Sequence, residues 1–140
     1  MESAAPAIVR RLRSAMNGHN PAAVAACFAE DYRNETPVHP ARGFTGREQV
    51  HRNWVQILGA VPDLTAVLIR WAADSEAVWA EWDWSGSRSA GPDLHLRGVT
   101  VLGVDADGAV AQWARFYMEP VDEGSDGVAA AVSATVGSAP

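Results

Sequence analysis

Two carboxylates and one arginine lie among aromatic residues in strand-like segments of the second half of the chain. Glu81 and Asp83 alternate with tryptophans, and Arg115 follows a further tryptophan two residues earlier. A carboxylate among tryptophans must pair with a cation or take up a proton, because burying an isolated charge costs too much free energy. If Arg115 faces Glu81, the carboxylate stays ionised and is held in place; otherwise Glu81 is a candidate proton shuttle. A solvated ladder of ion pairs on an open sheet face is the alternative interpretation.

Tyr32 and Asn34 form a second candidate set, two residues apart in a segment predicted to be extended. Such side chains share one strand face, so a phenol and an amide could together orient a polarised oxygen or a water. Capping of a sheet edge is the alternative. His39 lies in a proline-rich loop and His95 in a predicted strand; histidine titrates near neutral pH, but a lone histidine is more often incidental. The four histidines have no metal-ligand spacing, so we expect no metal site.

Sequence motifs of the common nucleotide- and serine-dependent enzymes are absent. The chain has no G-x-G-x-x-G fingerprint, no phosphate-binding loop and no G-x-S-x-G elbow. Its single cysteine, Cys27, cannot form an internal disulfide, which fits a reducing, cytoplasmic setting.

Three helices are predicted in the first half of the chain, where they would position these groups. Apolar residues recur at four-residue spacing over Ile8–Met16, which predicts an amphipathic helix ending at the following Asn-Gly pair. Asn20 is placed to cap a short second helix that begins with proline. Thr45 and Glu48 form a capping-box pattern that predicts the start of a third helix. The apolar stripe of this third helix consists of Val50, Trp54, Ile57, Leu58 and Val61.

The second half of the chain is predicted to form a four-stranded antiparallel meander. Turn residues separate segments rich in β-formers, and Asp105–Gly108 gives a clear hairpin signal. Helices followed by a meander indicate an α+β fold rather than an alternating parallel one. The expected strands are Leu64–Ala72, Glu76–Ser85, Leu94–Val104 and Val110–Pro120.

The period of a β-strand divides the tryptophan strand into two sets of side chains. Trp79, Glu81 and Asp83 share one face, whereas Trp82 and Trp84 share the other. Because both sets contain tryptophan, the pattern does not indicate which face the helices cover. The chain holds six tryptophans, and each buries about 150–250 Å² when removed from water. We therefore expect a homodimer through the sheet; a single core that takes up all the tryptophans is the alternative.

The composition limits the classes of partner. With 140 residues the chain is long enough for one domain, and its net charge of −6 argues against nucleic acid or an anionic membrane as a partner. No apolar run is long enough to span a membrane, and arginines near the N-terminus argue against a signal peptide. We predict one domain over residues 1–122 and a flexible tail over residues 123–140, with weak helical tendency at Val128–Val132.

Four parts of the sequence form a recognisable combination: Asn20-Pro21, Gly43–Glu48, Trp79–Gly86, and Asp105–Gly108 ahead of Trp113–Tyr117. Together they resemble the SnoaL-like polyketide cyclase branch of the nuclear transport factor 2-like superfamily, which includes ketosteroid isomerases. The resemblance covers roughly Ile8 to Val121. It implies a cone, or cystatin-like roll, in which a strongly curved sheet wraps a long helix around an internal pocket. It also implies a protein that works without a cofactor and forms dimers through the sheet.

The resemblance also assigns expected site positions. In the epoxide hydrolases of that superfamily, a Tyr-x-Asn pair positions water together with an Arg-x-Asp strand and a last-strand aspartate. Tyr32-Arg33-Asn34 matches the first of these elements, and Glu81-Trp82-Asp83 stands where the Arg-x-Asp pair is expected. Arg115 stands near the last-strand acid, so the charges are partly swapped. We expect the pocket to be lined further by His39, Trp54, Trp79 and Tyr117.

Two functions are compatible with these residues. The first is a cofactor-free isomerase, cyclase or hydrolase that acts on a small apolar carbonyl or epoxide compound. In it, Asp83 or Glu81 moves a proton and Arg115 holds the carboxylate or an oxyanion. Tyr32 with Asn34 orients the reacting oxygen. The second is a non-catalytic ligand-binding or dimerisation module of the same fold, which is favoured if the acids face solvent.

Overall fold

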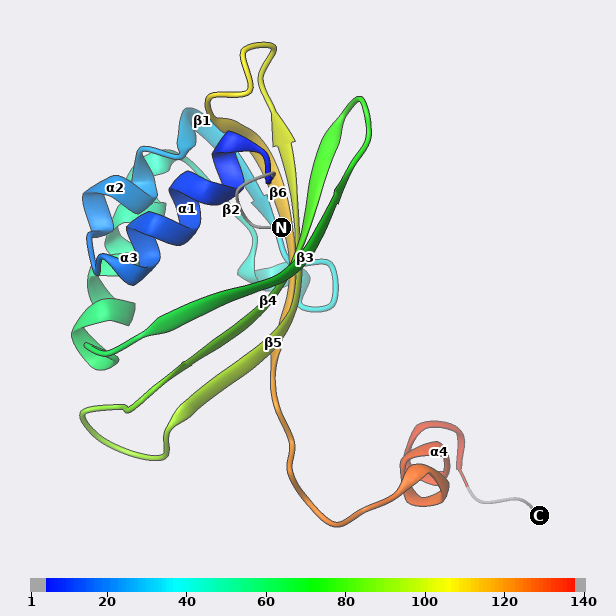
Figure 1. The fold of residues 1–140 in the computed structure, drawn as a ribbon. Coiled ribbons are helices and arrows are strands. Elements are labelled where there is room, and N and C mark those ends of the chain that lie inside the picture. The colour runs from blue at the N-terminus through cyan, green and yellow to red at the C-terminus, as the bar shows by residue number, and fades with distance from the viewer. Residues whose placement is uncertain (1–4, 138–140) are drawn as a thin grey trace.

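The computed structural model describes residues 5–137. Within them, three helices pack on one face of a strongly curved, six-stranded sheet, and a fourth helix stands apart near the C-terminus (Figure 1). The α+β fold predicted from the sequence is confirmed. The helices are α1 (Ala7–Asn17), α2 (Pro21–Ala25), α3 (Arg47–Ala60) and α4 (Val128–Val136), with a 3-10 turn at Pro40–Arg42. The strands are β1 (Phe28–Glu35), β2 (Phe44–Thr45), β3 (Thr65–Ala73), β4 (Ala77–Gly86), β5 (Leu94–Val104) and β6 (Ala111–Pro120).

The predicted meander is present, but it forms only part of a larger mixed sheet. The strand order is β2-β1-β6-β5-β4-β3, and the last four strands along the chain pair antiparallel as expected. β1 adds parallel to β6, and β2 pairs antiparallel with β1. The expected sheet of four antiparallel strands is therefore wrong in this respect. The β1–β6 pair joins segments about 80 residues apart, and local periodicity carries no information on such a pairing.

Helix boundaries follow local chemistry, with one exception. Asn20 caps α2 by accepting a hydrogen bond from the backbone N–H of Ala23 at 3.1 Å. The capping box expected at Thr45 and Glu48 is wrong, because Thr45 pairs with β1 as part of β2. The N-cap position of α3 is Gly46, whose φ of 103° is readily available to glycine.

The sheet has one face against the helices and one face without such cover. Along β4, Trp82 and Trp84 are buried in the core with residues of α1 and α3, while Glu81 and Asp83 are half-buried on the opposite face. The two sets predicted from strand periodicity are thus confirmed, and the structure identifies the tryptophan set as the inner one. Trp82 donates its indole N–H to Thr100 Oγ1 at 2.9 Å, so this buried polar pair is satisfied. We call the helix-covered side of the sheet the inner face and the other side the outer face.

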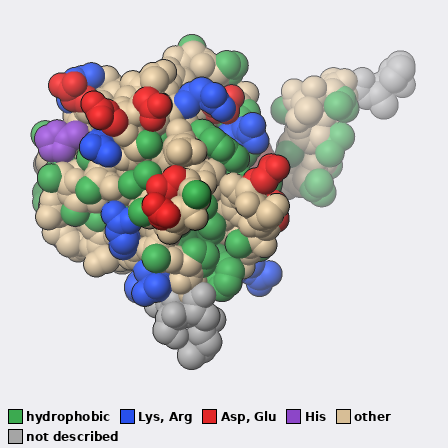
Figure 2. All heavy atoms as spheres, turned by 90° about the horizontal axis from the view of Figure 1, so that it is seen from above, with side chains coloured by type: hydrophobic (Ala, Val, Ile, Leu, Met, Phe, Trp, Pro, Cys, Tyr) green, Lys and Arg blue, Asp and Glu red, His purple; other side chains and the backbone are tan. Residues whose placement is uncertain are grey.

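The C-terminal segment contains the helix α4 where the sequence showed weak helical tendency. Its residues are exposed, and it stands beside the main body (Figures 1 and 2). The division into a domain of residues 1–122 and a flexible tail stays a prediction. No described helix is long and apolar enough to cross a membrane.

Candidate functional site

Two adjoining, partly open pockets lie between α3 and the inner face of the sheet, and we treat them together as the two lobes of one interior cavity. The polar lobe, of about 180 Å³, is lined by Tyr32, Asn34, Phe44, Val50, Asn53, Trp54, Ile57, Trp84 and Phe116. The apolar lobe, of about 290 Å³, is lined by Trp54, Gln56, Ile57, Ala60, Val61, Leu64, Trp84, Arg88, Leu94 and Leu96. Trp54 and Trp84 border both lobes and meet edge to face with ring centroids 5.9 Å apart.

The floor of the polar lobe is a buried hydrogen-bonded pair. Tyr32 donates its hydroxyl proton to Asn34 Oδ1 at 2.8 Å, and both residues are buried. Asn34 Nδ2 reaches Thr36 Oγ1 over a long 3.4 Å. Burial raises the pKa of Tyr32 far above its ordinary value, so the phenol keeps its proton at any physiological pH. The pair therefore offers neutral hydrogen-bonding groups to the cavity.

A third polar side chain, Asn53, enters the polar lobe from α3. Its Oδ1 accepts a hydrogen bond from Gln49 Nε2 at 2.7 Å, and Gln49 Oε1 in turn accepts one from Arg52 at 2.8 Å. Sequence reasoning missed Asn53, although a signal was present. Asn53 lies between Val50 and Trp54 in the apolar stripe of α3, where a polar residue is out of pattern.

The cavity holds very little charge. Among the described lining residues the one charged side chain is Arg88, which borders the apolar lobe from the β4–β5 connection. Trp84 carries a buried indole N–H for which no described residue provides an acceptor. The lining is thus apolar with a few neutral polar groups, which is typical of a small-molecule site.

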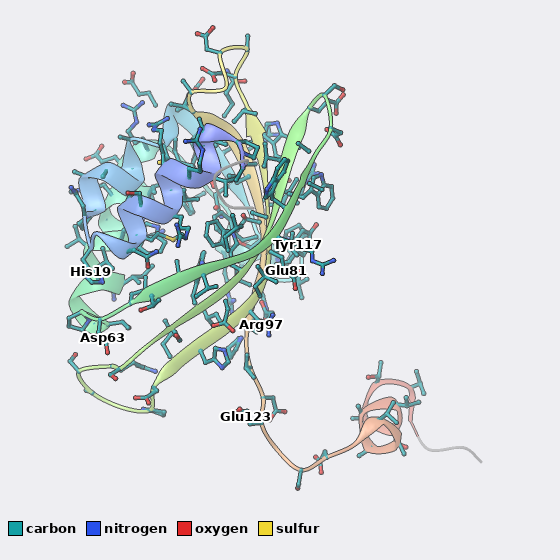
Figure 3. All side chains as sticks on the ribbon, viewed as in Figure 1. His19, Asp63, Glu81, Arg97, Tyr117 and Glu123 are labelled. Carbon is teal, nitrogen blue, oxygen red and sulfur yellow. The ribbon has the colours of Figure 1, made fainter. Side chains whose placement is uncertain are left out.

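The two predicted acids lie on the outer face, away from this cavity. Glu81 forms ion pairs with Arg70 at 3.7 Å and Arg97 at 3.9 Å. Asp83 contacts His95 at 3.0 Å and Arg97 at 3.5 Å. Figure 3 shows Glu81, Arg97 and Tyr117 on the side of the sheet opposite the helices. These groups form the ladder of ion pairs that was the alternative interpretation of the sequence.

Arg115 does not face Glu81. Its guanidinium lies 3.5 Å from Glu35 and stacks 5.0 Å from the ring centroid of Trp113. β5 separates β6 from β4 in the sheet, so two strand spacings of about 4.8 Å lie between the two residues. Of the two alternatives, the structure therefore shows Arg115 pointing elsewhere, and Arg70 and Arg97 are the cations that pair with Glu81.

The residues expected to bind substrate fall into two groups. Tyr32, Asn34 and Trp54 line the cavity. Trp79 and Tyr117 lie on the outer face and are 46% and 37% exposed. His39 contacts Glu119 on β6 at 3.1 Å and borders neither lobe. The sequence did not separate these groups because aromatic residues occur on both faces of the strands.

A wider groove of about 850 Å³ lies between α2, β2 and the start of α3, and it mixes acidic and basic side chains that are largely exposed. The buried polar groups that lie beside apolar walls are in the interior cavity and not in this groove. We therefore place the candidate site in the interior cavity. In the described part of the chain, no group of three or more His, Cys, Asp or Glu side chains could hold a metal ion.

Comparison with known proteins gives a consistent result. The family model described as the SnoaL-like domain matches residues 9–113. A hypothetical protein of Catenulispora acidiphila with a ketosteroid isomerase-like fold, in complex with trimethylamine, is similar with a TM-score of 0.69 and 20% identity over 80% of this chain and 85% of that one. A proposed SnoaL-like polyketide cyclase of Shewanella denitrificans is similar with a TM-score of 0.65 and 12% identity, over 80% of this chain and 88% of that one. A proposed ketosteroid isomerase of Kribbella flavida is similar with a TM-score of 0.66 and 25% identity, over 87% of this chain and 82% of that one. No curated protein matches the chain.

Proposed function

The chain belongs to the SnoaL-like domain family, and from this premise we propose that it binds a small, mostly apolar molecule with a hydrogen-bond-accepting oxygen in the interior cavity. The observation that carries the proposal is the lining of the cavity. Aromatic and aliphatic walls surround neutral polar groups at one end, from Tyr32, Asn34 and Asn53. Small-molecule sites are commonly clefts of about 300–1,000 Å³ with this division of apolar area and few polar groups.

Acid–base catalysis by the predicted acids finds no support in the geometry. A general base must lie within hydrogen-bond reach of the proton that it removes, about 2.6–3.2 Å. Glu81 and Asp83 are held on the outer face by Arg70, Arg97 and His95, with the sheet between them and the cavity. This arrangement favours the non-catalytic, ligand-binding function over the reaction led by Asp83 or Glu81.

Blocking one lobe tests the proposal. Ala60 borders the apolar lobe, so Ala60→Trp should fill it, whereas Val55→Trp places the same ring on an exposed face of α3. We expect the bicyclic ketone 2-decalone to bind the unmodified protein and Val55→Trp alike in isothermal titration calorimetry, and Ala60→Trp at least about 10-fold more weakly. Equal binding to all three proteins, or no binding to the unmodified one, contradicts the proposal.

A cofactor-free isomerase or cyclase acting on a carbonyl compound is the second candidate. It is favoured by the neutral donors of the polar lobe, which can polarise a carbonyl oxygen, and by the proposed activities of the relatives from Shewanella denitrificans and Kribbella flavida. Exchange of the α-hydrogens of 2-decalone in D2O, followed by NMR, decides between the two. A rate above that of the buffer supports catalysis; the ligand-binding function predicts no acceleration.

We also propose that the outer face pairs with a second copy of the chain. It exposes large apolar side chains, Val67, Ile69, Trp79 and Tyr117, beside the ion pairs that Glu81 forms with Arg70 and Arg97. A two-fold axis would bring the same apolar patch against itself and remove it from water. A cytoplasmic location stays a prediction from the single cysteine.

A further inference from the structure

A chain of hydrogen bonds runs along α3 from the surface to the cavity. Glu48 holds Arg52 at 3.4 Å, Arg52 donates to Gln49 Oε1 at 2.8 Å, and Gln49 Nε2 donates to Asn53 Oδ1 at 2.7 Å. The four residues are three or four positions apart, which is the spacing at which side chains meet on a helix. The last of them, Asn53, borders the polar lobe.

The guanidinium at the start of this chain fixes the polarity of both amides. Arginine has donors only, so the group of Gln49 that meets Arg52 must be its oxygen. The amide nitrogen of Gln49 then faces Asn53, and the group of Asn53 that receives it must be Oδ1. With its oxygen engaged, Asn53 has its carboxamide N–H groups left to offer to the lobe.

We propose that Asn53 binds an oxygen of the ligand through its carboxamide N–H, and that Gln49 and Arg52 are positioning residues that hold this donor in place. This inference rests on the proposed function and narrows it to ligands whose oxygen only accepts, such as ketones and esters. Asn34 acts in the same sense, because Tyr32 occupies its oxygen and the long contact with Thr36 takes up at most one of its two N–H groups. Among the described residues of the lobe, the amide donors of Asn34 and Asn53 outnumber the one free acceptor, the hydroxyl oxygen of Tyr32. The lobe therefore prefers a ketone, whose oxygen accepts both donors, to the corresponding alcohol.

Reversing the direction of the hydrogen bond between Gln49 and Asn53 tests the inference. In Gln49→Glu the carboxylate still accepts from Arg52, but it has no N–H to give, so Asn53 turns its nitrogen toward it and its Oδ1 toward the lobe. Gln112→Glu makes the same change at an exposed position of β6 that borders neither lobe, so it adds the same charge and leaves Asn53 untouched. The affinities of 2-decalone and 2-decalol, measured by calorimetry, report the polarity of the lobe.

We expect the unmodified protein and Gln112→Glu to prefer the ketone by about 3- to 10-fold, and Gln49→Glu to lose or reverse this preference. A preference that is unchanged in Gln49→Glu overturns the inference. Asn53→Leu, which removes one donor without adding charge, provides a second route. It should reduce the preference to the part that Asn34 provides, and a preference that is unchanged there also overturns the inference.

The proposed ligand-binding function and the role of Asn53 can be contradicted separately. If neither compound binds the unmodified protein, or if Ala60→Trp does not weaken 2-decalone, the proposed function falls and this inference falls with it. If 2-decalone binds in the cavity with no preference over the alcohol, the proposed function stands and only the role of Asn53 is wrong.

Discussion

Replacement of Tyr32 by phenylalanine tests the polar floor of the cavity with a minimal change. The ring would keep its contacts with Phe28 and Phe44, whose centroids lie 4.6 and 6.0 Å away. The hydroxyl that donates to Asn34 Oδ1 at 2.8 Å would be removed. Because Tyr32 is 1% and Asn34 7% exposed, the acceptor that remains would have little access to solvent.

The magnitude follows from this burial. Leaving a buried acceptor without its donor costs about 1–3 kcal/mol. We take about 1–2 kcal/mol for Tyr32→Phe, because the Asn34 amide can turn toward the lobe and recover part of the loss. For a chain of this size, that corresponds to a fall in Tm of about 3–8 °C.

The same substitution has a signature at alkaline pH. The raised pKa of Tyr32 means that the folded protein retains the phenol proton while the unfolded chain loses it above about pH 10. The stabilising contribution is therefore complete below that pH and is lost as the pH rises, by up to about 1.4 kcal/mol per pH unit for one proton. Tyr32→Phe should remove this part of the alkaline loss of stability.

Urea unfolding at pH 7 and at pH 10–11 measures both effects. Tyr117→Phe is the matched control, since Tyr117 lies on the outer face and is 37% exposed; it should change the free energy of unfolding by less than about 0.5 kcal/mol. Asn34→Ala and the double variant complete a cycle whose coupling free energy should be about 1 kcal/mol. A coupling of zero, with Tyr32→Phe as stable as the unmodified protein, would refute the reasoning.

Three further predictions concern other parts of the molecule. Thr100→Val removes the acceptor of the buried Trp82 indole at nearly constant volume, so urea unfolding should show a loss of about 1–3 kcal/mol; a loss below 0.5 kcal/mol would contradict the role of this bond. Cys27 is buried and burial raises the pKa of its thiol, so a disulfide reagent at pH 8 should modify it only when the chain is unfolded in urea; fast reaction of the folded protein would be inconsistent with this. Trp79→Glu adds an acid to the exposed apolar patch of the outer face, so sedimentation velocity should show a shift from dimer to monomer, and an unchanged mass would exclude that face as the interface.

Local periodicity predicted much of the fold. The four-residue spacing over Ile8–Met16 predicted α1, and the alternation along Val78–Trp84 divided β4 into its true sets of side chains. Both patterns arise because one helix or strand packs one side against the core, and this periodicity is visible within a short segment of sequence. The parallel pairing of β1 with β6 depends on two distant segments, and no window contains both.

The site was harder to predict than the fold. Tyr32, Asn34 and Trp54 line the polar lobe, and their spacing in the sequence indicated a shared location, because two of them share a strand face and the third lies on the apolar stripe of a helix; their role in binding stays a prediction. Glu81 and Asp83 were assigned to the same pocket because tryptophans flank them. The flanking rings point to the opposite face of the strand. The face on which a strand residue lies is indicated by the residues two positions away, not by its immediate neighbours in the sequence.

The central claim is that the inner cavity, rather than the charged outer face, receives the ligand. An NMR titration with 2-decalone tests it most directly, because each tryptophan indole N–H gives its own resonance. The account predicts shifts at Trp54 and Trp84, which border both lobes, and none at Trp79, which is exposed on the outer face. Shifts at Trp79 with Trp54 and Trp84 unmoved would contradict it.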